Sequence, residues 1–389
     1  MGHDTKTTQK QMKKIIILGA GMVGKAMAID LSKKYEVTSA DIFDKSLDYL
    51  ASNYSINTKK FDISDLAVLQ NEIKDFDLVV SAVPGFMGYK TLETCIKAGK
   101  NILDISFLPE NIDSLDALAK ENNVTVIMDC GVAPGVPNFI AGYYYKRLKI
   151  SEIEYMVGGL PKTRVFPFEY KAPFSPIDVI EEYTRPARYV ENGFEVIKPA
   201  MSDTELLNFS PVGTLEAFNT DGLRSLIYNL PDVPNMKEKT LRYPGHVNLI
   251  QTLIAGGFFS KEKITVNSTE IRPLDVTLKI LFDQWKLGAE EPEFTIMRVK
   301  IVGNDGTETQ EIIYNLYAEY DPVEKLSSMA RATGFTGTAG AELILNGMFS
   351  EYGVFPPEIV GMNANCFDFV MNHLKNRNIN YIKTVNIIG

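Results

Sequence analysis

The chain has 389 residues, of which 45% are hydrophobic and 23% charged, as in a folded globular protein and unlike a disordered chain. The 49 acidic residues outnumber the 40 basic ones, and the net charge of −9 argues against a protein that binds the phosphates of nucleic acids. No apolar run reaches the roughly 20 residues that cross a bilayer, and the three His and three Cys lack metal-ligand or disulfide-framework spacing. We therefore expect no membrane contact, no nucleic-acid partner and no metal.

The first 12 residues are polar, of mixed charge, and lack the apolar centre of a signal peptide. We expect residues 1–12 to form a disordered leader. Because few cysteines indicate a reducing compartment and no export signal is recognisable, the expected location is the cytoplasm.

A glycine-rich turn follows the leader. Residues 13–18 read KKIIIL, a short apolar strand, and the next six read GAGMVG, with Gly19, Gly21 and Gly24 in the G-x-G-x-x-G pattern before a helical stretch at 25–34. In this pattern the first glycine permits a tight turn, the second lets a pyrophosphate approach the backbone, and the third lets the helix pack on the strand. The helix N-terminus adds free N–H groups and the positive end of its dipole. The motif predicts a dinucleotide site.

An acidic residue follows the second predicted strand, 36–40. Asp41 stands where a carboxylate accepts hydrogen bonds from the adenosine ribose hydroxyls, and its charge would repel a 2′-phosphate. The next residue is Ile42, and no Arg lies close by to receive such a phosphate. We therefore predict NAD as the cofactor in preference to NADP.

Strands and helices continue to alternate up to residue 135, which predicts a Rossmann-like, doubly wound parallel α/β sheet. Further strands are expected at 57–61, 77–83, 101–106 and 124–128, with helices at 66–73, 89–98 and 115–122. Ligands of such sheets bind beyond the carboxyl ends of the strands. The predicted cofactor contacts are therefore Gly19, Gly21, Met22, Val23, Gly24, Asp41, Asp62, Ile63, Ala82, Val83, Pro84 and Ser106.

The pattern changes after residue 151 to that of a sheet-rich domain. A strand is predicted at 153–160, a helix at 175–183, and a hairpin from strands 295–302 and 311–320 around the turn Gly303-Asn304-Asp305-Gly306. Helices are predicted at 326–334, 338–346 and 365–377.

Several motifs in one order resemble the saccharopine dehydrogenase family over nearly the whole chain. They are the glycine turn, Val83-Pro84-Gly85, Asp104-Ile105-Ser106, residues 131–135 (GVAPG), residues 213–218 (GTLEAF) and residues 240–246 (TLRYPGH). The resemblance implies an NAD-binding Rossmann domain at 13–135, an inserted α+β substrate and dimerisation domain at 136–325, and a C-terminal segment, 326–389, that returns to the first domain. It also implies a homodimer and oxidation or formation of carbon–nitrogen bonds on lysine or its adducts.

Two subgroups of the family compete. The glutamate-forming members carry an Arg in a P-N-R-D-S segment that clamps a substrate carboxylate, where this chain has Thr220 within Phe218-Asn219-Thr220-Asp221-Gly222. They also tend to have an aromatic residue where this chain has His246. Both differences make the chain more similar to the lysine 6-dehydrogenases, although Arg224 lies close enough to take the place of the missing Arg.

Hydride transfer from an amine requires the nitrogen to lose a proton, because a lysine ammonium has a pKa of about 10.4. Asp104 is the first candidate for a general base or an ammonium anchor, with a backbone anchor as the alternative. Cys130 either lines the substrate pocket or packs, and Asp129 is equally placed. His246, with an ordinary pKa of about 6.5, suits proton transfer unless it is a buried structural residue.

The remaining candidates concern the substrate's own charges. Arg242 and Arg224 are candidates for pairing with its carboxylate, with an ion pair between Arg242 and Glu216 as the alternative for Arg242. Glu216 and Asp221 are candidates for binding its α-ammonium, and Tyr243 donates to substrate or packs. The full predicted set is Asp104, Cys130 and His246 as catalytic residues that also contact substrate, with Gly131, Glu216, Asp221, Arg224, Arg242 and Tyr243 as further substrate contacts.

The reaction that the resemblance implies is NAD-dependent oxidative deamination of L-lysine at its ε-carbon, giving a semialdehyde that cyclises. The alternative within the family is saccharopine dehydrogenation that forms glutamate. An alternative of another class is a dinucleotide-binding regulatory protein without turnover.

Overall fold

The computed structural model describes residues 12–108, 110, 112–173, 176–288 and 290–388, and it divides into two compact units. The first unit comprises Met1–Met128 and Ile344–Val354, and the second comprises Asp129–Leu343 and Phe355–Gly389. The sequence-based divisions at 135 and 325 differ from these, and the segment that rejoins the first unit is shorter than expected. The leader expected at 1–12 lies, apart from Met12, outside the described residues.

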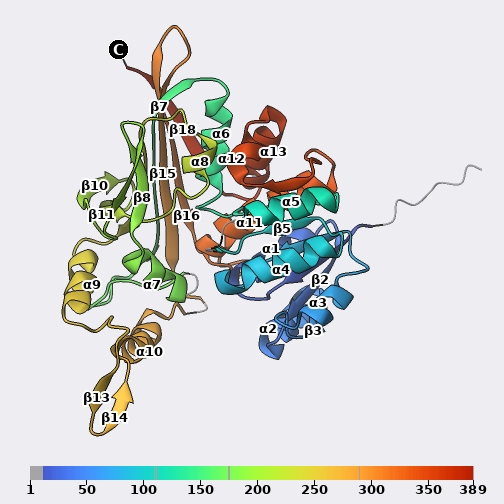
Figure 1. Cartoon of the computed structure of the whole chain (residues 1–389), viewed down its shortest axis with the longest axis horizontal. Coiled ribbons are helices and arrows are strands. Elements are labelled where there is room, and N and C mark those ends of the chain that lie inside the picture. Colours follow the sequence, from blue (N-terminus) through green and yellow to red (C-terminus); the bar gives the residue numbers. More distant parts are fainter. Residues whose placement is uncertain (1–11, 109, 111, 174–175, 289, 389) are drawn as a thin grey trace, which may run out of the picture. The chain divides into compact units, whose positions relative to one another are not determined.

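A parallel sheet forms the centre of the first unit (Figure 1). Its strands, in spatial order, are β17 (Gly353–Phe355), β6 (Thr125–Ile127), β5 (Ile102–Asp104), β4 (Leu78–Ser81), β1 (Lys14–Leu18), β2 (Glu36–Asp41) and β3 (Asn57–Lys60). The helices are α1 (Met22–Ser32), α2 (Asp44–Tyr54), α3 (Leu66–Glu72), α4 (Gly85–Lys97) and α5 (Asp113–Glu121). The strand order reverses beside β1, so right-handed connections place α1 and α2 on one face and α3, α4 and α5 on the other.

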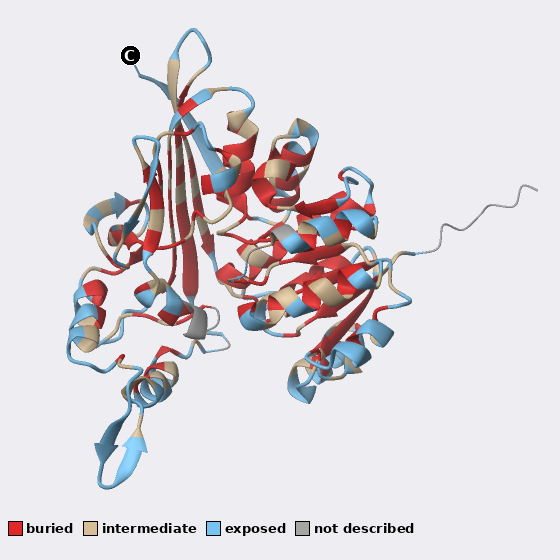
Figure 2. Cartoon of the chain, viewed as in Figure 1, coloured by how far each residue is buried: buried red, intermediate tan, exposed pale blue. Residues whose placement is uncertain are grey.

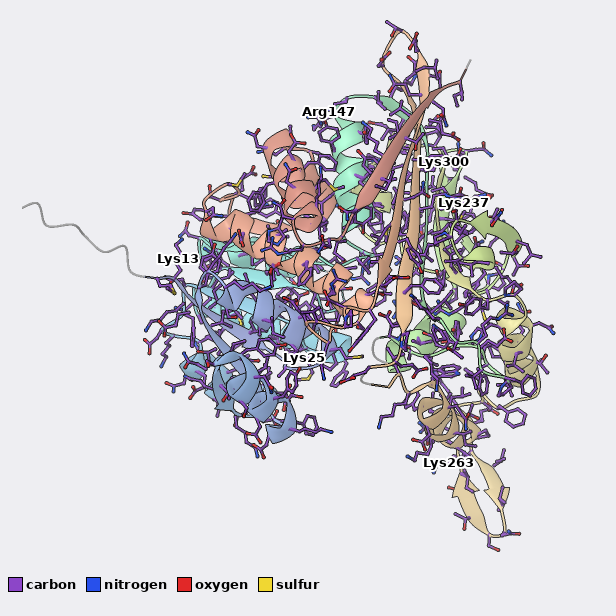
Figure 3. All side chains as sticks on the ribbon, turned by 180° about the vertical axis from the view of Figure 1, so that it is seen from behind. Lys13, Lys25, Arg147, Lys237, Lys263 and Lys300 are labelled. Atoms are coloured by element: carbon purple, nitrogen blue, oxygen red, sulfur yellow. The ribbon has the colours of Figure 1, made fainter. Side chains whose placement is uncertain are left out.

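Apolar side chains explain these strands. In β1 the residues Ile15, Ile16, Ile17 and Leu18 are fully buried, as parallel strands covered by helices require. The late segment is fastened to the early one by long-range hydrogen bonds. Lys13, labelled in Figure 3, donates its Nζ to the Leu345 carbonyl at 2.5 Å, and the Thr125 hydroxyl donates to the Glu351 carbonyl at 2.8 Å.

A mixed sheet of nine strands forms the second unit. Its main path is β10 (Glu205–Phe209), β11 (Gly213–Asn219), β12 (Met236–Arg242), β7 (Lys149–Pro161), β15 (Glu293–Asn304), β16 (Thr309–Glu319) and β18 (Tyr381–Ile387), and β8 (Ala187–Glu191) and β9 (Phe194–Lys198) branch from β12. The helices are α6 (Val136–Tyr145), α7 (Pro176–Thr184), α8 (Leu226–Asn229), α9 (His246–Ala255), α10 (Pro273–Trp285), α11 (Ser328–Leu345), α12 (Pro357–Gly361) and α13 (Ala364–Lys375). A separate ribbon, β13 (Ile264–Val266) and β14 (Thr269–Ile271), is exposed (Figure 2).

The predicted hairpin is present as β15 and β16, whose residues pair without interruption from Phe294 and Glu319 to Asn304 and Thr309. Two other expectations for the C-terminal part need correction. The helices predicted at 326–334 and 338–346 form the single helix α11, because its internal glycines do not interrupt it. Strand β18 was not predicted, and it pairs with β16 at the edge of the sheet. The predicted start of α7 at residue 175 lies outside the described residues.

Each unit has its own apolar core, which appears as buried strands in Figure 2. The core of the second unit contains a group of large aromatic side chains that includes Tyr170, Tyr183, Phe218 and Trp285. Within the described ranges no helix is long and apolar enough to span a bilayer, and no three His, Cys, Asp or Glu side chains gather as a metal site would require.

Candidate functional site

The glycine turn after β1 has the geometry that the motif predicts. Gly19 has a φ of +103°, and a Cβ atom there would lie 2.6 Å from the Ala82 carbonyl oxygen, at the end of neighbouring β4. A Cβ atom at Gly24 would lie 2.0 Å from the Gly19 carbonyl oxygen. A Cβ atom at Gly21 would have no atom within 4 Å. Two glycines therefore serve close packing, whereas Gly21 borders open space beside the helix.

That open space lies at the N-terminus of α1. Gly21 is the N-cap and no side chain caps the helix there, so its first backbone N–H groups and the positive end of its dipole remain available to an anion. Lys25, labelled in Figure 3, lies in the next turn with its Nζ 4.9 Å from the centre of the Tyr49 ring, and burial lowers its pKa. The arrangement fits a dinucleotide pyrophosphate.

Asp41, at the end of β2, is positioned beside the turn by two backbone donors. Ala20 N–H donates to its Oδ2 at 2.7 Å and Phe43 N–H to its Oδ1 at 3.0 Å. Lys60, its neighbour in register on β3, is paired with Asp44 at 2.5 Å. The turn therefore has a carboxylate beside it, and the lysine that faces this carboxylate in register on β3 is paired with Asp44.

Met22 and Val23 are the first two residues of α1, and the other predicted cofactor residues follow the ends of β3, β4 and β5. Met22 and Pro84 are exposed, Val23 and Ala82 are half-buried, and Ile63 and Val83 are buried. Asp62 is exposed and accepts hydrogen bonds from the Ser64 N–H and hydroxyl, which lower its pKa.

Asp104 is fully buried at the end of β5. It accepts hydrogen bonds from the Ser106 N–H at 3.0 Å and from the Ser106 hydroxyl at 2.8 and 2.9 Å. Ser106 is tightly packed, because a Cβ atom at Gly88 on α4 would lie 2.3 Å from its Oγ. In this structure Asp104 anchors the loop after β5, which corresponds to the backbone-anchor alternative.

In the second unit, a buried ion pair joins Asp129 to Arg224. The Arg224 Nε donates to Asp129 Oδ2 at 2.8 Å, and both residues have left-handed φ angles, +50° and +49°. The other carboxylate oxygen, Oδ1, has no hydrogen-bond partner among the described residues. Burial raises the pKa of Asp129, and the Arg224 charge opposes that shift. A strained, incompletely satisfied carboxylate therefore lies inside the second unit.

The two residues after Asp129 pack against α11. Cys130 is fully buried and its Sγ donates to the Thr336 carbonyl at 3.5 Å, while a Cβ atom at Gly131 would lie 3.2 Å from Thr333 Cγ2. A nucleophilic or proton-transfer role for Cys130 is not favoured, because catalytic thiols require access and an electropositive setting. The packing interpretation fits its surroundings.

Strand β12 carries a polar stripe on one face. Glu238, Thr240 and Arg242 occupy alternate positions and therefore point to the same side of the sheet, and all three are buried. The Thr220 hydroxyl, from the segment after β11, donates to Glu238 Oε2 at 2.6 Å and lies 2.9 Å from the Thr240 hydroxyl. The stripe thus begins with a carboxyl, continues with the Thr240 hydroxyl and ends with a guanidinium, and the Thr220 hydroxyl joins the first two.

Arg242 forms an ion pair with Glu182, Nη2 to Oε2 at 2.8 Å, and its Nε donates to the Tyr183 hydroxyl at 2.9 Å. Glu216, its register partner on β11, instead accepts the Gly245 N–H at 3.1 Å. The anticipated Arg242–Glu216 pair is therefore corrected to Arg242–Glu182, because α7 brings Glu182 to the buried guanidinium.

His246 lies in the aromatic core with both ring nitrogens engaged. Its Nδ1 is 2.8 Å from the Phe168 carbonyl and its Nε2 3.0 Å from the Tyr183 hydroxyl. Burial, and next the Arg242 charge, lower the pKa of His246 to about 3. The ring is therefore neutral near pH 7, which fits a buried structural histidine better than a proton carrier.

Two further candidates are engaged within the protein. Asp221 receives a two-pronged pair from Arg188, Nε to Oδ1 at 2.9 Å and Nη2 to Oδ2 at 3.0 Å. The Tyr243 hydroxyl donates to the Pro161 carbonyl at 2.9 Å. In this structure Asp221 is not available to an α-ammonium, and the Tyr243 hydroxyl cannot donate to substrate, unless these contacts break.

Sequence reasoning did not single out Glu238. Burial, as the main cause, raises the pKa of Glu238 to about 8. The available signal was the alternation of polar residues in MKEKTLR, which marks one face of a strand. Its contact with Thr220 depends on the pairing of β11 with β12, and the composition of either segment alone does not indicate it.

Comparisons with known proteins cover both units. Residues 15–127 match the family model of the saccharopine dehydrogenase NADP binding domain, and residues 131–379 match that of the saccharopine dehydrogenase C-terminal domain. The chain is 24% identical over 279 residues to the mitochondrial alpha-aminoadipic semialdehyde synthase of Rattus norvegicus. The aligned region covers 67% of this chain but only 30% of the synthase. The chain therefore spans about a third of the length of that relative.

A second relative is closer in length. The saccharopine dehydrogenase [NADP(+), L-glutamate-forming] of Pyricularia oryzae is 26% identical over 283 residues, 69% of this chain and 63% of that enzyme. Among solved structures, apo saccharopine dehydrogenase (L-Glu forming) from Saccharomyces cerevisiae matches with a TM-score of 0.80 at 18% identity, covering 96% of this chain and 100% of that one. The structural match shows a shared fold.

Proposed function

Because the chain belongs to the saccharopine dehydrogenase family, we propose that it is an oxidoreductase that acts on a carbon–nitrogen bond of L-lysine with a nicotinamide dinucleotide. The first unit offers a dinucleotide site made of backbone groups, and the second offers a buried polar stripe suited to an amino acid. When bound, the nicotinamide supplies the hydride acceptor.

The proposed cofactor is NAD. The family model and the Pyricularia oryzae relative are named for NADP, whereas here Asp41 faces the place of the adenosine ribose from beside the turn. A carboxylate there accepts hydrogen bonds from both ribose hydroxyls and repels a 2′-phosphate. Lys60, which faces Asp41 in register on β3, is already paired with Asp44, and no Arg follows Asp41 closely in the sequence.

The lysine assignment depends mainly on Thr220. The glutamate-forming group has an Arg at this place, to which a substrate carboxylate binds, but here a hydroxyl donates to Glu238. The buried arginines of this region, Arg224 and Arg242, are each already paired with a carboxylate. A substrate without the glutamyl carboxylates therefore suits this site better than saccharopine.

The proposed reaction divides the work between the protein's residues and the substrate. A buried carboxyl near the amine takes up the proton that the ε-ammonium must lose, since only the neutral amine can support loss of hydride from the adjacent carbon. Exclusion of water by the packed aromatic core strengthens these electrostatic contacts. Hydrolysis of the resulting imine releases ammonia and a semialdehyde, which cyclises with its own α-amine.

Saccharopine oxidation is the second candidate, and one observation favours it: the relatives include enzymes named for that reaction. The test is the rate of absorbance change at 340 nm with L-lysine or saccharopine, each with NAD and with NADP. Lysine-dependent reduction of NAD is expected. Saccharopine turnover in place of lysine turnover would replace the proposal, and dinucleotide binding without turnover of any amino acid would favour a regulatory protein.

A further inference from the structure

Most buried acids of the second unit have an evident structural partner. The buried Asp129 and Asp221, and the half-buried Glu182, are each paired with an Arg at 2.8 to 2.9 Å. Glu293 accepts the N–H and hydroxyl of Ser328 at the start of α11, and Glu358, in the first turn of α12, accepts the carboxamides of two asparagines. These carboxylates neutralise a guanidinium or secure a helix end.

Glu238 differs from these acids. It is 6% exposed, lies in the middle of a strand, and forms no ion pair with any described residue. Its hydrogen bonds come from the Thr220 hydroxyl and the Gly222 backbone. A buried carboxyl without a counter-cation is costly, and no helix end or guanidinium in its surroundings accounts for it.

A second observation marks the same region. Tyr155 faces Glu238 across the β7–β12 pairing and donates to the Gly222 carbonyl at 2.7 Å. The charges of both Glu238 and Asp129 act on the Tyr155 hydroxyl, so the two carboxyls flank this side chain. Asp129 is 4% exposed, yet its Oδ1 has no hydrogen-bond partner among the described residues. Arg224, which also acts on Tyr155, is paired with Asp129, so Glu238 has no ion pair of its own among the described residues.

A primary ammonium complements these groups, because it carries one positive charge and three N–H donors. We propose that Glu238, held by Thr220 beside Thr240, is the anionic seat for a primary ammonium of the substrate. The proposal rests on the proposed function for the identity of the ligand. It also supplies a reason for selectivity, since a carboxylate could not compensate an ionised Glu238 as an ammonium does, and it would lie near the acids Glu182 and Asp221.

The seat predicts a proton exchange. Burial raises the pKa of Glu238 to about 8, so the carboxyl is mostly protonated at pH 7 until an ammonium ionises it. Ligand binding should release nearly one proton, and affinity should rise about tenfold per pH unit until pH 8. The titratable and charged groups around Glu238 are Glu182 on α7, Asp221 after β11 and Tyr155 on β7. Glu358 on α12 and Asp129 with Arg224 act on that tyrosine.

The test is titration calorimetry of the full chain at pH 7 with NADH present to prevent turnover. The probes are L-lysine, 6-aminohexanoate, which lacks the α-ammonium, and L-norleucine, which lacks the side-chain ammonium. Two buffers of different ionisation enthalpy report the released proton. Glu238→Gln should weaken lysine binding at least tenfold and abolish proton release.

The matched control is Glu154→Gln. Glu154 lies on β7 next to Tyr155 but on the opposite face of the sheet, where it pairs with Lys300 at 3.3 Å and lies in register with Lys237, both labelled in Figure 3. This variant should bind lysine as the unchanged protein does. The single-amine probe that loses affinity in Glu238→Gln identifies which ammonium occupies the seat.

Lysine binding by the unchanged protein without proton release, or equal lysine affinity in Glu238→Gln, would overturn the seat. The proton measurement needs no variant, so it decides the matter even if Glu238→Gln does not fold. Lysine that binds through Glu238 but is not oxidised would disprove the proposed reaction and leave the seat standing. If lysine is oxidised and binds Glu238→Gln with unchanged affinity, the proposed reaction stands and the seat at Glu238 is disproved.

Discussion

The glycine turn of the first unit consists of backbone groups, whereas the polar stripe of the second consists of side chains. At the turn, backbone groups do the work: a tight bend at Gly19, an open approach at Gly21 and an uncapped helix end. Along the stripe, buried side chains form the candidate site. Each depends on a partner from another element, as Arg242 depends on Glu182. A change at Gly21 should therefore alter binding with little effect on folding, whereas changes around the stripe should alter folding as well.

The largest effect is expected from Arg224→Ala. This change leaves Asp129 buried without its cation, and breaking a buried pair in this way costs about 3 to 5 kcal/mol. Urea unfolding followed by circular dichroism measures the loss. The control is Lys60→Ala, which breaks the exposed pair with Asp44 in the first unit and should cost at most about 1 kcal/mol. Equal losses would mean that the contrast in burial has no energetic consequence.

Gly21→Ala tests the opposite side of the comparison. The backbone there has a φ of −67° and a Cβ atom meets nothing within 4 Å, so the fold should tolerate alanine. The methyl group would occupy the approach of the pyrophosphate, and we expect dinucleotide affinity to fall about 100-fold. Fluorescence titration with NADH gives the affinity, and thermal unfolding without ligand should be unchanged. Unchanged affinity would show that the dinucleotide binds elsewhere.

The third effect concerns pH and the stripe. His246 has a pKa of about 3 in the folded protein and about 6.5 when unfolded, so between these values the unfolded chain binds the additional proton. Its contribution to stability is therefore complete above pH 6.5 and is lost as the pH falls towards 3, about 2 kcal/mol by pH 5. His246→Gln should lose correspondingly less stability than the unchanged protein between pH 7 and pH 5. Identical pH responses in urea unfolding would refute the buried, neutral imidazole.

The smallest effect is expected at Asp41, where one side chain contributes to an otherwise backbone-built site. Asp41→Ser removes the negative charge that repels a 2′-phosphate. It also removes the charged acceptor that hydrogen-bonds the ribose hydroxyls. NAD affinity should fall roughly tenfold while NADP affinity rises. Affinities for NADH and NADPH measured in parallel decide the matter. A preference that does not move would place cofactor choice outside Asp41.

The same contrast explains what the sequence could predict. The strand at 13–18, the turn, and Asp41 at the end of β2 follow from local spacing, because the groups concerned are close in sequence or lie on adjacent parallel strands. The hairpin of β15 and β16 was likewise visible from alternation around a turn. The strand, the turn and Asp41 agree with the Rossmann-like fold of the first unit, and the hairpin belongs to the sheet of the second.

The stripe depended on contacts that local patterns do not contain. Arg188 with Asp221, Glu182 with Arg242 and Thr220 with Glu238 join residues from separate elements. The sequence singled out Asp221 and Arg242 as polar residues in conspicuous motifs, but their partners depend on how α7, β8, β11 and β12 pack. Glu238 was missed for the same reason. The glycines of α11 were misleading because their helix-breaking tendency is weaker than the packing that keeps the helix continuous.

Strand β17 lies beside β6, although more than 200 residues separate them in the chain. During synthesis the first six strands emerge early, but the outer border of β6 stays open until almost the entire polypeptide has left the ribosome. An open border of this kind is a template for unwanted pairing with other chains. Production of the first 128 residues alone should therefore give a protein more prone to aggregation than the full chain.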